Sequence, residues 1–450
     1  MTRAPHRVTE LFLPNAPFRD AIGHSAVPEQ CIPGQRSMRR SNDPSSNVHF
    51  DFFLSEMSVS DAHGGGITLQ RLLGDKLRNI DRFFHLSQFG NDYPPAQAVQ
   101  DRTVDLCSWF EQAWLKRIVG CTAAMKLSQD RRMTTVHAKS AANRIDSMLA
   151  SGRPARAIVC PQGQRSVETL EHLKIQRPVE YVSWVMDDHV VRHTNGRWEY
   201  PLHFRPLFEK HLNEARAVFV ISSSMAEFYE REFGIKNSIV LIPPAEQLAP
   251  PMTTSIPGTT RLAYFGNLSS WAADALLAIA PFLIANKISL AVYSAGSQPT
   301  KTSAWEPIEF MGRTPQDELL ETMRSYDGLV LPMSFQNRDK HMVDLNIATR
   351  LSQYLASGNL VLAVGPDSAA MIRYLREQQA AIVVTDVNAT SMREAFHSVK
   401  NSHLRSRIVL RANDIVKNQL SLDTARRIWS ETIDGSFGSR TDRKEARHTL

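Results

Sequence analysis

A polar segment between two apolar stretches carries residue types that bind phosphate groups. The apolar stretch 327–335 leads into a polar loop. A helix that opens with Asn346, Thr349 and Arg350 is predicted to follow. In parallel α/β sheets such a loop aims the free N–H groups of the next helix at an anion, and Arg350 adds a positive charge. The segment therefore predicts a phosphate site, with a solvated first helical turn as the alternative.

A glycine-rich loop offers a second site for an anion. His63, Gly64, Gly65 and Gly66 follow the predicted strand 49–57 and stand just before a predicted helix. Consecutive glycines expose their N–H groups to a phosphate or a hydroxyl. The loop is not a Walker A loop, because no Gly-Lys-Ser/Thr follows it. A flexible surface turn is the alternative interpretation.

Two carboxylates and an imidazole follow the predicted buried strand 179–186. Asp187, Asp188 and His189 stand where an α/β domain places catalytic groups. Asp188 or His189 could orient or deprotonate a substrate hydroxyl. The alternatives are a helix cap and a metal site, but no partner cluster of metal-binding residues is evident, so we expect no metal.

Two weaker candidates follow predicted strands in the second half of the chain. Gly266 and Asn267 end the strand 261–267, where a glycine lets the backbone approach a phosphate or simply makes a tight turn. Arg313 follows the strand 308–312 and is either a ligand contact or an exposed arginine.

The elements that position these residues alternate between strands and helices. Further strands are predicted at 82–86, 155–160, 217–222, 238–242, 289–296 and 380–385. Such alternation indicates α/β folding with parallel sheets, here two Rossmann-like, doubly wound domains facing an interdomain cleft. The predicted divisions are a disordered arm at 1–46, an N-terminal domain at 47–247, a Pro- and Thr-rich linker at 248–260, a C-terminal domain at 261–434 and a solvated tail at 435–450.

Composition limits the classes of function. The 450 residues, 42% of them hydrophobic, are enough for two cores. The net charge of +6 is spread along the chain and accompanies no nucleic-acid-binding motif, so we expect no nucleic acid partner. Four widely spaced cysteines and the lack of a long apolar run predict a cytoplasmic protein with reduced thiols.

One apolar stripe admits two interpretations. Leu106, Phe110, Trp114 and Ile118 recur at helical spacing. Core packing is the first interpretation. Basic neighbours also allow peripheral contact with the inner face of a membrane, or a surface that lines the acceptor.

Four motifs together resemble the GT-B glycosyltransferases, and most closely the retaining glycosyltransferase family 4. They are the HGGG loop at 63–66, VFVISSSMAEFYEREFGIKNSIVLIPP from residue 218, LAYFGNLSSWAADAL from residue 262 and DLNIATRLSQYLASGNLVLAVG from residue 344. The resemblance covers roughly residues 50 to 430 at the level of element order. It implies a nucleotide diphosphate-sugar as donor.

The resemblance also implies roles for single residues. Gln353 matches a glutamate that holds the nucleotide ribose, and a neutral amide makes weaker hydrogen bonds than a carboxylate. Asp344 is the nearest match to an upstream acidic residue, and Arg350 matches a basic residue that meets the diphosphate. The loop 63–66 would lie beneath the donor phosphates or against the acceptor. The lysine usual after the glycine turn is missing from 268–276.

These observations predict an enzyme that moves a sugar from a nucleotide diphosphate-sugar to an acceptor hydroxyl, with retention implied by the resemblance. The acceptor is expected to be a glycan, a lipid-linked molecule or a small molecule, and no cofactor is expected beyond the donor. One alternative is a GT-B-like subunit that binds nucleotide without turnover, which Gln353 and the missing lysine favour. Another is a nucleotide-sugar epimerase with an acidic-histidine pair.

Overall fold

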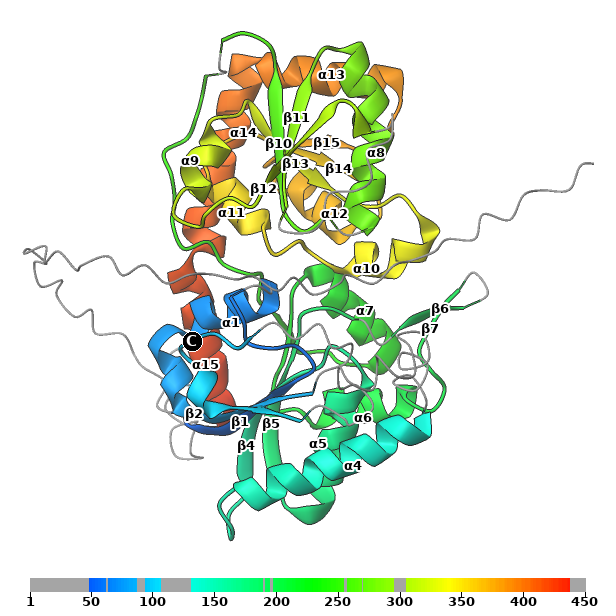
Figure 1. The fold of residues 1–450 in the computed structure, drawn as a ribbon, viewed down its shortest axis with the longest axis vertical. Helices are drawn as coiled ribbons and strands as arrows, with labels where there is room; N and C mark the ends of the chain where they lie inside the picture. The colour runs from blue at the N-terminus through cyan, green and yellow to red at the C-terminus, as the bar shows by residue number, and fades with distance from the viewer. Residues whose placement is uncertain are drawn as a thin grey trace, which may run out of the picture.

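The computed structural model describes residues 48–61, 64–86, 94–106, 131–188, 191–194, 197–254, 257–268, 270–294 and 305–437. The predicted arm at 1–46, most of the tail, His63, His189 and most of the apolar stripe lie outside the described residues. Within them, two parallel sheets stand one above the other in Figure 1.

The first sheet has seven strands in the order β3-β2-β1-β4-β5-β8-β9, and every pairing is parallel. Its strands are β1 (Phe50–Ser55), β2 (Ile80–His85), β3 (Thr103–Asp105), β4 (Ala155–Cys160), β5 (Val179–Val185), β8 (Val218–Val220) and β9 (Ser238–Val240). The accompanying elements are α1 (Gly64–Leu73), α4 (Arg131–Met148), α5 (Gln164–Gln176), α6 (Arg205–Glu214), α7 (Ser223–Phe233), the short helices η1 (Gly74–Asn79) and η2 (Gln100–Arg102), and the antiparallel pair β6 (Arg192–Thr194) and β7 (Arg197–Glu199).

The second sheet has six strands in the order β12-β11-β10-β13-β14-β15, again all parallel. Its strands are β10 (Arg261–Phe265), β11 (Ser289–Tyr293), β12 (Ile308–Gly312), β13 (Gly328–Pro332), β14 (Val361–Val364) and β15 (Ile382–Val384). The helices are α8 (Ser270–Ala285), α9 (Leu319–Arg324), η5 (Asn337–Asp339), α10 (Lys340–Leu345), α11 (Leu351–Ala356), α12 (Ala370–Glu377), α13 (Ala389–Lys400), α14 (Ser402–Ile415), η6 (Val416–Leu420) and α15 (Leu422–Phe437). The predicted fold class is confirmed.

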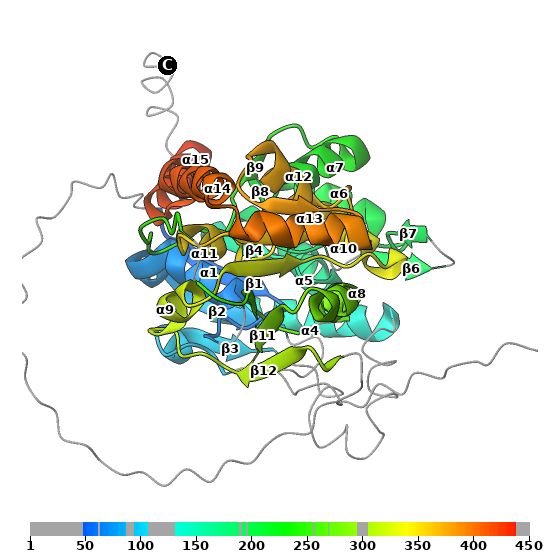
Figure 2. The same ribbon diagram turned by 90° about the horizontal axis from the view of Figure 1, so that it is seen from above.

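Each sheet carries an apolar core on both of its faces. The last helix, α15, returns to the first domain, as Figure 1 shows, and in the view from above α14 and α15 lie at the same side of the molecule (Figure 2). The Trp429 ring stacks on Phe219 with their centroids 4.8 Å apart and lies 5.8 Å from Trp184. Most of α15 lies within the range 261–434 predicted for the second domain, yet its apolar side packs on the first sheet.

The predicted linker is attached along the second domain. The Ala249 N–H donates to Ala356 O at 2.9 Å, and the Met252 N–H donates to Gly358 O at 2.7 Å. Gly358 has a φ of +71°. A Cβ there would lie within 3.0 Å of the linker backbone, so the close approach requires glycine. The linker therefore fixes the path between the two sheets.

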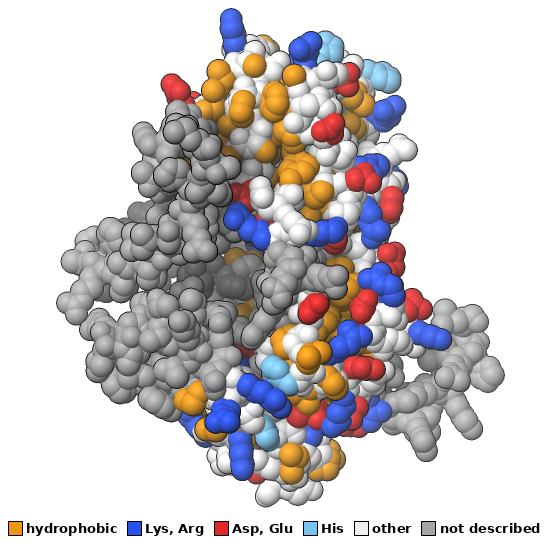
Figure 3. All heavy atoms as spheres, turned by 90° about the vertical axis from the view of Figure 1, so that its right-hand side faces the viewer, with side chains coloured by type: hydrophobic (Ala, Val, Ile, Leu, Met, Phe, Trp, Pro, Cys, Tyr) orange, Lys and Arg blue, Asp and Glu red, His pale blue; other side chains and the backbone are white. Residues whose placement is uncertain are grey.

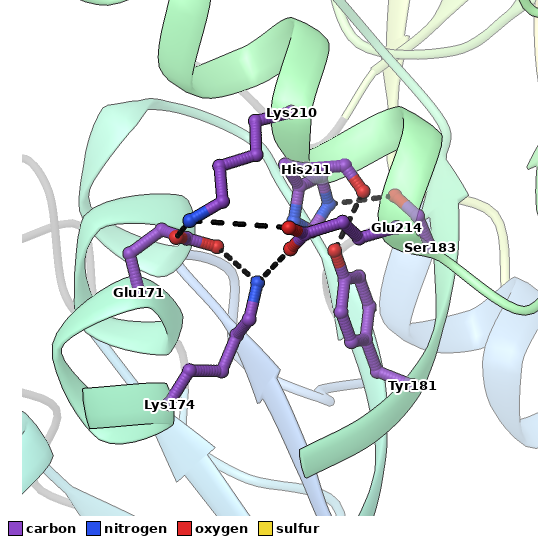
Figure 4. A network of polar contacts seen from close by, with 7 residues as sticks. All are labelled: Glu171, Lys174, Tyr181, Ser183, Lys210, His211 and Glu214. Carbon is purple, nitrogen blue, oxygen red and sulfur yellow. Dashed lines mark hydrogen bonds and ion pairs between the residues drawn. The ribbon is translucent and has the colours of Figure 1, made fainter. Parts of the chain in front are cut away.

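A polar network joins α5, β5 and α6 on the first domain, as Figure 4 shows. Lys174 and Lys210 pair with Glu171 and Glu214. Beneath these ion pairs the buried His211 ring lies 2.9 Å from Ser183 Oγ through its Nε2. Burial lowers the pKa of His211 to about 3, so the ring is neutral at pH 7. This network holds α6 against the sheet.

Charges of both signs intermingle on the described surface seen in Figure 3, with apolar side chains between them. Among the described residues, no helix is both long enough and apolar enough to cross a bilayer.

Candidate functional site

The domains meet where the carboxyl ends of the two sheets face each other, with α1 and α7 below and α10 and α11 above in Figure 1. Ser222 Oγ donates to Leu345 O across this junction. Ser222 also caps α7 by accepting from the Met225 N–H at 2.9 Å. The Ser224 hydroxyl, in the first turn of α7, accepts from Arg373 in the second domain.

Asp187 and Asp188 follow β5 and bind the second domain. Asp187 Oδ1 accepts from Asn346 Nδ2 at 2.7 Å. Asp188 is 1% exposed, and its Oδ2 lies 3.2 Å from His341 Nε2 and accepts from the Tyr200 hydroxyl. The buried carboxylate is therefore held by both domains.

Two tyrosines surround Asp188. Burial, reinforced by the Asp188 charge, raises the pKa of Tyr200 and of Tyr229 well above the ordinary range. Both hydroxyls stay protonated, and Tyr200 acts as a donor. Asp188 is thus enclosed, whereas Asp187 is only half-buried. Asp187 is therefore the more accessible of the two carboxylates.

The segment after α10 differs from its prediction. Asn346 ends a helix instead of opening one, because its N–H donates to Met342 O at 2.8 Å and its ψ of 148° leaves the helical region. The next helix, α11, begins at Leu351 with Arg350 as its N-cap and has six residues. Its dipole is correspondingly small, so side chains are the main source of positive charge here.

The three glycines form the first turn of α1 instead of preceding it. A Cβ on Gly66 would lie 2.5 Å from the Ser60 nitrogen, so this turn requires glycine. A Cβ on Gly64 would lie 3.2 Å from Thr349 Oγ1. The start of α1 therefore lies directly against the second domain, beside Arg350.

Gly266 and Asn267 lie at the carboxyl end of β10. The Tyr264 hydroxyl donates to Asn267 O at 2.7 Å and would lie 2.6 Å from a Cβ on Gly266. Burial raises the pKa of Tyr264, and the Arg350 charge opposes that shift, so Arg350 acts on this strand end. Tyr264, which contacts both Gly266 and Asn267, therefore lies within electrostatic reach of Arg350.

Arg350 also lies against Gln353, and Gln353 in turn faces Arg71 of α1. Arg350 Nη1 can donate to Gln353 Oε1 at 3.3 Å. With the amide turned over, its oxygen instead accepts from Arg71 of α1 at 2.5 and 3.0 Å. No sequence signal places Arg71 beside a residue 282 positions later, and the same is true of Tyr200 and His341 beside Asp188.

Two predicted residues lie apart from this group. Arg313 is exposed after β12, the edge strand, two strands from β10. Asp344 accepts from Lys340 within α10 and from Ser368 Oγ at 2.6 Å. Within the described part of the chain, no hydrogen bond or ion pair joins either residue to Arg350 or Gln353.

Among the described residues, no group of three or more His, Cys, Asp or Glu side chains could hold a metal. The expected independence from metals stays a prediction.

The sequence matches no protein-family model and no curated protein. Solved structures share its fold. A sucrose-phosphate synthase from Thermosynechococcus elongatus has a TM-score of 0.63 at 12% identity, covering 89% of this chain and 100% of its own. A glycosyltransferase from Rickettsia africae has a TM-score of 0.57 at 11% identity, and the match covers 87% of this chain and 99% of that one. HepE from Anabaena, in complex with UDP, has a TM-score of 0.54 at 10% identity, and the match covers 85% of this chain and 99% of that one. The chain therefore has the two-domain GT-B glycosyltransferase fold.

Proposed function

We propose that the protein is a glycosyltransferase that moves a sugar from a nucleotide diphosphate-sugar to an acceptor hydroxyl. Structures of the same fold are named as a glycosyltransferase and a synthase, and one holds UDP. One observation carries the proposal most directly. Gly64 in the first turn of α1 lies against Thr349, and the adjacent Arg350 lies beside Gln353, which also faces Arg71 of α1.

The donor diphosphate would lie at this junction. As the bond from the sugar to the diphosphate breaks, negative charge builds on the leaving oxygen. Arg350 would neutralise that charge, and N–H groups in the first turn of α1 would donate to the phosphates. This proposal requires no metal.

The acceptor would approach from the first domain. Asp187, half-buried at the end of β5, would orient its hydroxyl, while Asp188 would act as a positioning residue through His341 and Tyr200. The acceptor class is a glycan, a lipid-linked molecule or a small molecule with a free hydroxyl. Retention of anomeric configuration follows from the resemblance to family 4.

A panel of nucleotide diphosphate-sugars tests this proposal. Binding to the native state alone raises the melting temperature. We expect one base to stabilise the wild type, and Arg350→Ala to weaken binding by about tenfold to a hundredfold, as for a lost charge-assisted contact. The control is Arg427→Gln, which removes an exposed arginine paired with Glu431 on α15. If no nucleotide stabilises the wild type, the donor site is wrong.

A second candidate is nucleotide binding without transfer. Asp187 and Asp188 already accept hydrogen bonds from Asn346 and His341 of the second domain, which favours a closed binding protein. The same panel separates the two functions when an acceptor mixture is added. A donor that stabilises the protein but yields neither glycosylated product nor free nucleoside diphosphate would support binding alone.

A further inference from the structure

We infer that Arg71 is a further substrate-binding residue, and that together with Arg350 it forms a phosphate site between the two domains that Gln353 keeps open. We call these two residues the arginine pair. The inference deepens the proposed function and rests on it, because it adds a residue of the first domain to the donor side of the junction.

The pair faces a single acceptor atom. Gln353 lies between the two guanidiniums, and its amide oxygen can turn to Arg71, at 2.5 and 3.0 Å, or to Arg350, at 3.3 Å. An amide presents one acceptor end and one donor end. The shorter distances favour Arg71. The amide nitrogen then faces Arg350, whose guanidinium has no other hydrogen-bond acceptor among the described residues.

The charges around the pair are also unbalanced. Arg71 Nε lies 3.2 Å from Glu246 Oε2, and the Arg71 side chain is 14% exposed. Burial lowers the pKa of Arg71, Glu246 opposes this shift, and the Arg350 charge adds to it. Glu246, which is 43% exposed, pairs with Arg71, and within the described residues no carboxylate forms an ion pair with Arg350. A partly buried site with an unmatched positive charge favours an anionic ligand.

Phosphate is the ligand class that fits this arrangement. Guanidinium forks bind phosphate oxygens through paired hydrogen bonds, and the first turn of α1 adds N–H groups on the Arg71 side. Two sources share this chemistry: the diphosphate of a donor and a phosphate ester on an acceptor. In either case the ligand would contact Arg71 of one domain and Arg350 of the other, and so hold the domains together.

The amide at Gln353 is what keeps this site available. A carboxylate there would have two oxygens, one for each guanidinium, and would pair with both. Gln353→Glu should therefore stabilise the empty protein and close the site. If Arg71 and Arg350 did not form a phosphate site, a carboxylate at position 353 would instead be expected to make stronger hydrogen bonds to a nucleotide ribose. Gln353→Glu would then tighten nucleotide binding.

Calorimetric titrations of the full chain with inorganic pyrophosphate, with nucleoside diphosphates and with glucose 6-phosphate test the inference. We expect Arg71→Met and Gln353→Glu each to weaken binding of the phosphate ligand by at least about tenfold. Arg71→Lys should retain part of the affinity. Gln353→Glu should also raise the melting temperature without ligand. Arg427→Gln and the exposed Gln316→Glu are controls for the same changes in net charge and should leave binding unchanged.

The outcomes separate this inference from the proposed function. The inference is overturned if Gln353→Glu binds the phosphate ligand as tightly as the wild type or more tightly, or if Arg71→Met binds it unchanged. The proposed function still stands in that case if the wild type binds a nucleotide. Binding of pyrophosphate or glucose 6-phosphate but of no nucleotide, with both variants impaired, supports the site and contradicts the proposed donor. No binding of any phosphate compound to the wild type overturns both. Should Arg71→Met fail to fold, Gln353→Glu still decides.

Discussion

Replacing His341 should loosen the junction and weaken donor binding together. His341 is 8% exposed, and its Nε2 lies 3.2 Å from a carboxylate oxygen of Asp188, which has a fully buried side chain. His341→Phe keeps a ring beside Phe228, whose centroid lies 5.2 Å away, but removes the N–H donor. A hydrogen bond to a charged group contributes about 1.5–3 kcal/mol. We expect a loss in that range, and about 0.5–1.5 kcal/mol more for His341→Ala, which also removes the ring contact.

Urea unfolding measures the loss, and hydrogen exchange of the α10 amides shows where it occurs. Exchange in α10 should accelerate in His341→Phe, because the contact joins α10 to the first domain. Tyr200→Phe removes the other donor to Asp188 from within the first domain, so it should cost stability without opening α10 as much. His403→Phe, at an exposed position on α14, is the matched control. Stability of His341→Phe within about 0.5 kcal/mol of the wild type, with unchanged α10 exchange, would refute the reasoning.

Four other substitutions should have defined effects. Gly66→Ala should cost about 1–3 kcal/mol in urea unfolding because its Cβ would lie 2.5 Å from the Ser60 backbone, whereas Gly64→Ala, with its nearest contact at 3.2 Å, should cost less. Burial lowers the pKa of His211 from 6.5 to about 3, so as the pH falls the unfolded chain takes up a proton on this ring at a higher pH than the folded protein does. Stability should fall as the pH drops from about 6.5 towards 3, by at most about 4–5 kcal/mol, and His211→Gln should remove this dependence. Burial raises the pKa of Glu168 from 4.5 to about 7. The contribution of its protonated carboxyl to the free energy of unfolding is therefore greatest below pH 4.5 and is lost as the pH rises through 7. Glu168→Gln should flatten the stability curve there, by up to about 3 kcal/mol.

The strands were predictable because buried parallel strands are continuous apolar runs. The predicted strand 155–160 matches the buried strand β4 in full. The predicted strand 308–312 matches the edge strand β12, whose residues instead alternate between less and more exposed positions. Helix ends were less predictable. The six residues of α10 are too few to show a helical period, so its polar sequence suggests a loop. The apolar side of α15 indicates burial, but nothing in its pattern identifies which sheet it covers.

The candidate site was predictable only where its residues follow strands. Asp187 stands two residues after β5 and Gly266 directly after β10, and the carboxyl end of a parallel strand is where ligand groups collect. The partners that decide what these residues can do come from distant segments. His341 lies 153 positions from Asp188, and Arg71 lies 282 positions from Gln353. Such pairings depend on how the domains meet, which spacing in one sequence does not encode.

A crystal structure of the protein with the nucleoside diphosphate that stabilises it most would test the central claim directly. The account predicts phosphate oxygens within hydrogen-bonding distance of the Arg350 guanidinium and of N–H groups in the first turn of α1, beside Thr349. A diphosphate bound elsewhere, with Arg350 turned away from it, would contradict the account.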